Sequence, residues 1–240
     1  MEKENKIYIA LDSDVLRALV DLHSALTGDP KFKTEDSRDF MISKNGDFLK
    51  ELLRKIEKDK IRIFVPNTVF HEVKHKKAVC SFIMDFCYLT NLNILNFDEI
   101  ISKTDELALK YCTMSYEYRG EKFFSPLNIH YDPAQRKNVP SNDAYAMAES
   151  TLANCILITG NGKDLVYDRF RPDDKNSRSN GIRIINDICG YNTQEEDRTI
   201  TPRSFELDQF VKMITKFGWD GFNMPEANMS HMIKASEIVI

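Results

Sequence analysis

The segment Ile7-Tyr-Ile-Ala-Leu-Asp-Ser-Asp-Val-Leu16 decides the fold class, because its periodicity changes from that of a strand to that of a helix at Asp12. Ile7 to Leu11 form a short apolar run of residues that favour strands. After Asp12 the apolar residues recur at helical spacing from Val15 to Leu26. We therefore expect a buried strand, an acid at its carboxyl end, and then a helix.

Glu72 also lies in a helix that follows a predicted strand. The β-rich run at 61–65 ends at Pro66, and the helix that Thr68 can cap carries Glu72 in about its first turn. Residues 27–46 are polar and contain turn formers, so they are expected to form a loop or insertion. A helix over 48–56 is expected between this insertion and the strand.

The C-terminal half contains further acids in the same kinds of context. Ser141 is an expected N-cap, which places Asp143 at the start of a helix. The apolar strand at 155–158 ends in Thr159-Gly-Asn-Gly-Lys-Asp164. The other expected elements are a helix at 78–89, an extended segment at 92–97, a helix at 100–118, irregular structure at 119–140, a strand at 182–185 and a final helix that Pro202 and Ser204 open and that runs through Phe217.

Strands that alternate with helices predict an α/β fold. Right-handed crossovers then give a mainly parallel central sheet flanked by helices, in three layers. Residues that follow the carboxyl ends of such strands meet at the edge where ligands bind. Neither a repeat nor a Gly/Ser-rich or Pro-rich linker divides the chain. We expect one domain over residues 1–240, with insertions at 27–46 and within 78–140.

The composition is that of an ordinary globular protein. The 240 residues are 42% hydrophobic and 29% charged, with a net charge of −4. This charge argues against bulk attraction to nucleic acid, so any contact with phosphates must be local. The N-terminus lacks a signal sequence and no run of about 18 apolar residues occurs, which predicts a cytoplasmic protein without membrane contact. The five cysteines are widely spaced and predict reduced thiols.

Four segments taken together carry a family resemblance. They are Ala10-Leu-Asp-Ser-Asp-Val-Leu16, Val65-Pro-Asn-Thr-Val-Phe-His-Glu-Val73, Ser141-Asn-Asp-Ala-Tyr-Ala-Met-Ala-Glu149 and Leu157-Ile-Thr-Gly-Asn-Gly-Lys-Asp-Leu165. In this order they resemble the signature segments of the PIN-domain nuclease family. Ile200-Thr-Pro-Arg-Ser-Phe205 looks like the closing strand of that family and the entry to its last helix. The resemblance covers the first 26 residues, 47–77 and 141–217.

The resemblance implies a metal-dependent endoribonuclease. Asp12 matches the aspartate of the first strand, Glu72 the helix glutamate, and Asp143 the aspartate of the penultimate helix, while Asn161 or Asp164 completes the site. Thr159 matches the family's Ser or Thr, which orients the first aspartate or the attacking water. Such carboxylates would bind Mg²⁺ or Mn²⁺, because these hard cations prefer oxygen ligands.

The resemblance also bears on substrate and partners. Lys74, Lys76 and Lys77 follow Glu72 and are candidates for contact with substrate phosphates, although a solvated helix face is the more common explanation of such a charge run. Aromatic and basic residues at 119–137 would suit stacking of unpaired bases. RNA is the expected substrate, with single-stranded DNA as a second. Toxins and defence nucleases occur in the family, so an antitoxin, another regulatory protein or a second copy of the chain are candidate partners.

Two other functions compete with this interpretation. Asn161, where many family members have Asp, would suit a degenerate PIN-like module that binds RNA or protein without cleavage. Asp12-Ser-Asp14 after a first strand also resembles the start of haloacid-dehalogenase-like phosphatases. That motif calls for Thr or Val where Leu16 stands, so the nuclease is preferred to the phosphatase.

Overall fold

β1 (Ile7–Leu11) and α1 (Ser13–Thr27) form the strand and helix predicted on either side of Asp12. The computed structural model describes residues 6–33, 39–93, 97–118, 120–160, 185–186, 203–219 and 224–238. The next elements are η1 (Pro30–Phe32), α2 (Asp39–Glu57), β2 (Ile61–Val65), α3 (Asn67–Val73), α4 (Lys77–Phe86), β3 (Cys87–Thr90) and α5 (Phe97–Thr113). They are followed by β4 (Ser115–Tyr118), β5 (Glu121–Phe124), β6 (Ile129–Asp132), β7 (Lys137–Pro140), α6 (Asn142–Leu152), β8 (Ile156–Thr159), β9 (Ser204–Glu206), α8 (Leu207–Phe217), η3 (Met229–His231), β10 (Met232–Lys234) and η4 (Ala235–Glu237).

The central sheet of the described residues has six strands in the order β10-β3-β2-β1-β8-β9. All neighbouring pairs are parallel except β10 and β3. β1 lies inside the sheet, with Ile9 opposite Ile63 of β2 on one side and opposite Ile156 of β8 on the other. The predicted α/β class with a mainly parallel sheet is therefore confirmed.

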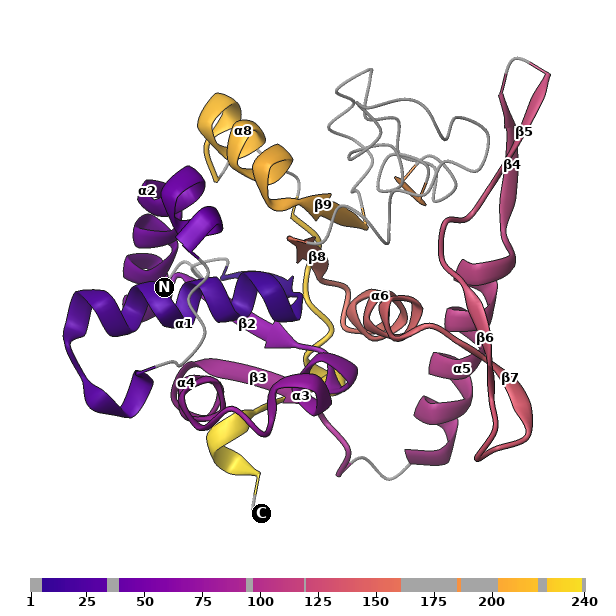
Figure 1. The fold of residues 1–240 in the computed structure, drawn as a ribbon, viewed down its shortest axis with the longest axis horizontal. Helices are drawn as coiled ribbons and strands as arrows, with labels where there is room; N and C mark the ends of the chain where they lie inside the picture. The colour runs from indigo at the N-terminus through magenta and orange to yellow at the C-terminus, as the bar shows by residue number, and fades with distance from the viewer. Residues whose placement is uncertain are drawn as a thin grey trace.

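Helices pack around this sheet (Figure 1). α1 contacts α2 and α4, whereas α6 contacts α5 and α3. The chain runs from β1 to β2 and β3 in one direction, and it later returns past β1 to β8 and β9. Right-handed crossovers in opposite directions place their helices on opposite faces of a parallel sheet. The arrangement is thus compatible with the predicted three layers.

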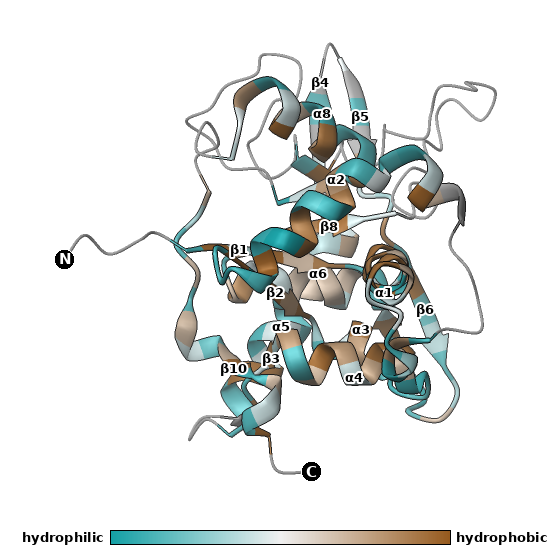
Figure 2. Ribbon diagram, turned by 90° about the vertical axis from the view of Figure 1, so that its left-hand side faces the viewer, coloured by the Kyte–Doolittle hydropathy of each residue, from teal (hydrophilic) through white to brown (hydrophobic). Residues whose placement is uncertain are grey.

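The middle strands form the centre of the hydrophobic core. Ile9, Phe64 and Ile158, from β1, β2 and β8, are buried, as are their neighbours along each strand. Continuous apolar runs of this kind are expected where helices cover a parallel sheet. Figure 2 shows helices that are hydrophobic on one side and hydrophilic on the other around these strands. No described helix combines the length and the apolar character needed to cross a membrane.

Several element boundaries differ from the predictions. Residues 39–46, predicted as loop, belong to α2. The helix predicted at 78–89 ends at Phe86, and Cys87–Thr90 form β3 directly after it. Residues 94–96 of the extended segment predicted at 92–97 lie outside the described residues. The stretch at 119–140, predicted as irregular, contains β5 and the hairpin of β6 with β7. Only Ile185 of the strand predicted at 182–185 lies within the described residues, and it is helical.

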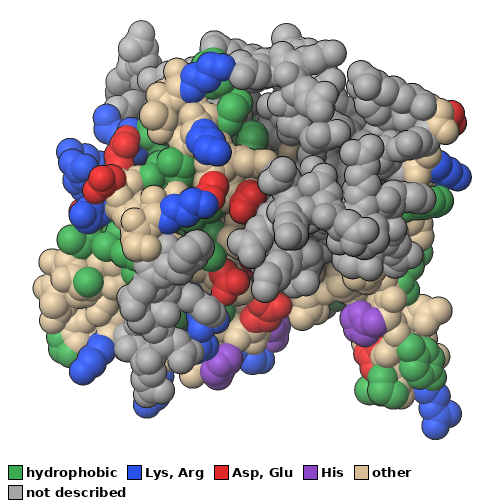
Figure 3. All heavy atoms as spheres, turned by 45° about the horizontal axis from the view of Figure 1, so that its top comes forward, with side chains coloured by type: hydrophobic (Ala, Val, Ile, Leu, Met, Phe, Trp, Pro, Cys, Tyr) green, Lys and Arg blue, Asp and Glu red, His purple; other side chains and the backbone are tan. Residues whose placement is uncertain are grey.

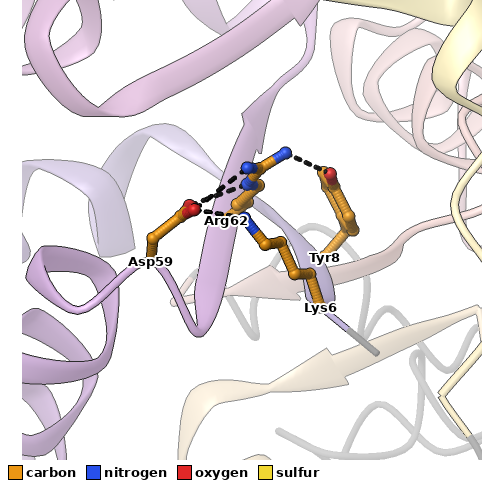
Figure 4. Close-up of polar contacts among 4 residues, drawn as sticks. All are labelled: Lys6, Tyr8, Asp59 and Arg62. Carbon is orange, nitrogen blue, oxygen red and sulfur yellow. Dashed lines mark hydrogen bonds and ion pairs between the residues drawn. The ribbon is translucent and has the colours of Figure 1, made fainter. Parts of the chain in front are cut away.

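A polar cluster holds the amino-terminal ends of β1 and β2 together (Figure 4). The Asp59 carboxylate accepts hydrogen bonds from Nε and Nη2 of Arg62 at 2.8 and 3.1 Å, and another from Lys6. Nη1 of Arg62 donates to the Tyr8 hydroxyl at 2.7 Å. The hydrogen bonds from Arg62, and then from Lys6, hold the pKa of Asp59 well below its ordinary value of 3.8. The cluster lies at the end of the sheet opposite to Asp12.

The substitution Asp59→Asn should lower the unfolding free energy at neutral pH by up to about 1 kcal/mol, because exposed ion pairs contribute little more. The pKa is lowered on folding, so the stabilisation is present above the unfolded value of 3.8 and is lost as pH falls below it. Urea unfolding of wild type and variant should therefore give a difference that shrinks on acidification. A difference that grows in acid would contradict this account, and Asp47→Asn, at an exposed side chain of α2, is the control.

Candidate functional site

The order of the strands changes direction between β1 and β8. From β1 the chain builds the sheet outward through β2 and β3 on one side, and later through β8 and β9 on the other. In parallel sheets, ligands bind beyond the carboxyl ends of the two strands that meet at such a point. Asp12 follows β1 directly, and Thr159 is the last residue of β8. The topology therefore brings two of the predicted residues to the edge where a site is expected.

The Asp12 carboxylate is held from two sides. It caps α1, and its Oδ1 accepts a hydrogen bond from the Ser13 amide at 2.6 Å. Its Oδ2 accepts a hydrogen bond of 2.6 Å from the hydroxyl of Thr159, which is buried. The Asp12 amide donates to the Ile158 carbonyl at 2.9 Å and so extends the pairing of β1 with β8 by one residue. Of the two roles considered for Thr159, the structure shows the contact that orients Asp12.

Burial raises the pKa of Asp12 above its ordinary value of 3.8. The hydrogen bonds from Thr159 and Ser13 act in the opposite direction, because they favour the charged carboxylate. Asp14 and Glu72 raise the pKa further through charge repulsion. Asp14 itself lies 3.8 Å from the guanidinium of Arg17. Two other acids, Asp14 and Glu72, are therefore among the groups that shift the pKa of Asp12.

Glu72 and Asp143 lie where α3 meets α6. Glu72 is in the last turn of α3, later than predicted, because the helix begins at Asn67 and ends at Val73. Asp143 is in the first turn of α6, and Ser141 caps that helix as predicted by accepting from the Ala144 amide.

Asn142, next to Asp143, donates from Nδ2 to Oε1 of Glu72 at 3.3 Å. This hydrogen bond joins the start of α6 to the end of α3. The two acids predicted from separate segments are therefore brought to adjacent helix ends.

The predicted site residues fall into two groups. Asp12, Glu72, Asp143 and Thr159 lie within the described part of the chain, whereas Asn161 and Asp164 lie outside it. No three His, Cys, Asp or Glu side chains of the described part are close enough together to hold one metal ion. Figure 3 shows acidic side chains near the centre of one face, with His, Lys and Arg side chains below them.

The donor set can nonetheless be compared with what a divalent cation requires. The described acids supply carboxylate oxygens, and Asp12 is coupled to Glu72 by charge repulsion. Mg²⁺ usually keeps several waters and binds through one or two carboxylates together with substrate phosphates. The described residues fit that mode of binding, and they do not form a cage made of protein ligands alone.

The three lysines predicted to contact substrate have different surroundings. Lys74 lies at the end of α3, with its Nζ 2.9 Å from Nδ1 of His71. Lys76 and Lys77 lie at the start of α4 and line a cavity beside α1.

Glu149 is a buried acid that the sequence analysis did not select. Its carboxylate accepts hydrogen bonds from the Thr68 hydroxyl at 2.6 Å, the Thr90 hydroxyl at 2.9 Å and the Thr68 amide at 3.3 Å. The Asn67 amide also donates to it. Thr68, predicted to cap α3, instead donates to Glu149, which satisfies the first amides of the helix from α6. Burial raises the pKa of Glu149, and the hydrogen bonds lower it.

Glu149 therefore has a positioning role. It joins α6, which carries Asp143, to α3, which carries Glu72, and to β3. The signal in the sequence is an acid that directly follows three small or apolar helix residues, Ala146, Met147 and Ala148, all of which are buried. An acid of this kind is rarely buried unless it has partners.

Comparison of the chain with protein-family models, with curated proteins and with solved structures found no match. The geometry of the described residues and the motifs of the sequence are therefore the basis for assigning a function.

The substitution Thr159→Val should raise the pKa of Asp12 further, since it removes a hydrogen bond that favours the charged carboxylate. Carboxyl-carbon NMR titration of the metal-free protein measures this directly. Thr159→Ser retains the hydroxyl and is the matched control. An Asp12 titration that is identical in the Val variant and the wild type would show that the hydrogen bond has no electrostatic effect.

The substitution Glu149→Ala should destabilise the protein by about 1–3 kcal/mol, because it leaves the amides of Asn67 and Thr68 without their acceptor. Denaturant unfolding gives the magnitude. Glu106→Ala removes an exposed acid from neighbouring α5 and should change stability by less than about 0.5 kcal/mol. Equal losses in the two variants would refute the proposed bridge between α3 and α6.

Proposed function

We propose that the chain is a metal-dependent endoribonuclease with a PIN-like fold. The observation that carries the proposal is the position of Asp12 at the switch point of the parallel sheet, where Thr159 orients it and Glu72 repels it. Burying a carboxylate near other acids is unfavourable unless a cation offsets the charge. A divalent cation bound at this edge would supply that charge.

The proposed metal ligands are Asp12, Glu72 and Asp143, with Asp164 as a fourth and Asn161 as the alternative to it. Mg²⁺ or Mn²⁺ bound there would lower the pKa of the attacking water and stabilise the charge on the leaving oxygen. Thr159 holds Oδ2 of Asp12, so it fixes the orientation of that carboxylate. Asn142 holds Glu72 toward the start of α6, next to Asp143. These hydrogen bonds thus restrict the orientations of the proposed metal-binding carboxylates before a substrate binds.

The substrate and the partners follow from the same resemblance. RNA is the proposed substrate and single-stranded DNA the second choice. An antitoxin or another regulatory protein would be a partner if the chain acts as a toxin or defence nuclease, and a homo-oligomer is compatible with the proposal. The hairpins of β4 with β5 and β6 with β7 fall within the proposed insertion at 78–140.

A binding module without nuclease activity is the second candidate. Two observations favour it: the described residues contain no group of three potential metal ligands, and Asn161 replaces an acid of the family pattern. Such a module would bind RNA in the absence of metal and leave it intact after metal is added. Cleavage that requires Mg²⁺ or Mn²⁺ and that EDTA abolishes separates the nuclease from the module.

The substitutions Asp12→Asn and Asp143→Asn should each reduce metal-dependent RNA cleavage by orders of magnitude, because each removes the charge of a proposed ligand. Gel assays on tRNA, rRNA and single-stranded DNA would measure the loss and define the substrate. Asp59→Asn is a matched control, since it makes the same chemical change at the other end of the sheet and should leave cleavage intact. Full activity of either site variant, with folding verified by circular dichroism, would refute the assignment.

A further inference from the structure

A cavity of about 680 Å³ lies between α1, η1 and the start of α4. Among the described residues, its lining contains five basic side chains and one acid from these three regions: Arg17, Lys31, Lys33, Lys76 and Lys77, with Asp21. His75 also lines it. The whole chain has a net charge of −4, so this concentration of positive charge is a local exception. A hollow of this size and sign is suited to an anionic ligand.

The start of α4 adds to the positive potential of the cavity. Lys76 is the N-cap residue, and its side chain makes no capping hydrogen bond. Lys77, Ala78 and Val79, the first residues of this ten-residue helix, line the cavity. The first amides of a helix point outward along its axis and carry partial positive charge, which favours phosphate groups.

The wall formed by η1 is anchored by aromatic packing. Phe32 is buried, with its ring centroid 4.7 Å from that of His23 in α1 and 6.3 Å from that of Phe82 in α4. Lys31 and Lys33 flank this anchor, so their backbone positions are fixed at the cavity. Lys31 is paired with Asp85 at 2.5 Å, which leaves Lys33 as the better candidate on this wall for binding a ligand.

Two segments of chain connect the cavity to the acidic site. Arg17, which lines it, lies 3.8 Å from Asp14, and Asp14 raises the pKa of Asp12 by repulsion. On the other side, His75 and Lys76 follow α3, whose last turn carries Glu72. α1 contacts both α3 and α4, so the two segments run side by side from the acids to the basic cavity.

We propose that this cavity binds the backbone phosphates of a single RNA strand next to the scissile bond, without a metal ion. The identity of the ligand rests on the proposed function, because the strand that the cavity binds is the RNA that the acidic site would cleave. Contacts with phosphates are independent of sequence, so the cavity would contribute affinity and register and would leave base preference to other surfaces.

The test is fluorescence anisotropy of a labelled oligouridylate in EDTA, which measures binding without cleavage. The variant combines Lys33→Glu with Lys77→Glu; both side chains are exposed, and an acid at the first position of α4 favours the helix dipole. We expect affinity to fall about tenfold or more. The salt dependence of binding should weaken by about 0.7 unit of slope for each phosphate that the variant no longer binds, which is the value for single strands. The control combines Lys58→Glu with Lys234→Glu, which makes the same charge change at exposed sites elsewhere.

Two outcomes would overturn the proposal. One is an equal loss of affinity in both double variants, which would show only a general charge effect, and the other is no binding by the wild-type protein at low salt. A cleavage assay with Mg²⁺ separates this proposal from the nuclease assignment. If the wild-type protein cleaves no RNA and the Lys33 and Lys77 variant loses binding, the phosphate-binding role of the cavity is supported and the nuclease assignment is refuted. If cleavage depends on Asp12 but the Lys33 and Lys77 variant binds RNA as tightly as the wild type, the nuclease assignment is supported and the phosphate-binding role of the cavity is refuted.

Discussion

The pairing of β1 with both β2 and β8 is the constraint on which the rest of the structure depends. β1 is buried along most of its length and packed on both faces, so a shift of one residue would exchange the side chains between the two faces and disturb the packing of both. The register that packs the side chains of β1 into the core also determines which residue follows the strand at its carboxyl end, and that residue is Asp12. Its amide continues the pairing to Ile158, and its carboxylate then reaches Thr159. The geometry of the acidic edge is thus a consequence of core packing.

The second half of the acidic edge is fixed by a polar contact instead. Glu149 is buried without a cationic partner among its hydrogen bonds, and four neutral donors surround its carboxylate. Desolvating a carboxylate costs free energy that such donors offset only when all of them are in place. The relative position of α3 and α6 is therefore well defined, and Glu72 and Asn142 at their adjoining ends benefit from it.

The sequence predicted the elements in which the spacing of the apolar residues matches the side chains that are buried in the structure. The strand, acid and helix around Asp12 were correct because the apolar periodicity there reports the core directly. β3 was misplaced because α4 passes into it without a loop, so the apolar residues through Leu89 resemble a longer helix. β6 was missed because it is only four residues long and its side chains are mostly exposed, so the alternation in Ile129-His-Tyr-Asp132 is too short to indicate a strand with a buried face.

The candidate site likewise contains contacts that could be predicted from the sequence and contacts that could not. The contact of Thr159 with Asp12 was one of the two roles that the family resemblance implied for Thr159, and both residues lie at the carboxyl ends of buried strands. The role of Glu149 was not, since its partners Asn67, Thr68 and Thr90 lie more than fifty residues away and only tertiary structure brings them together. The basic cavity was anticipated only in part: Lys76 and Lys77 were candidates for phosphate contact, whereas Lys31 and Lys33 were not, because they come from a distant segment that only tertiary structure brings beside α4.

The central position of β1 has a consequence for biosynthesis. Its neighbour β2 ends at Val65, but its other neighbour, β8, begins only at Ile156. At about 5–20 residues per second, the roughly ninety intervening residues take on the order of 5–20 seconds to synthesise. Throughout that interval a nascent chain carries a hydrophobic strand with one unpaired edge, which is prone to join other strands. It also lacks the Thr159 partner of Asp12, so an assembled acidic edge arises only after most of the polypeptide has left the ribosome.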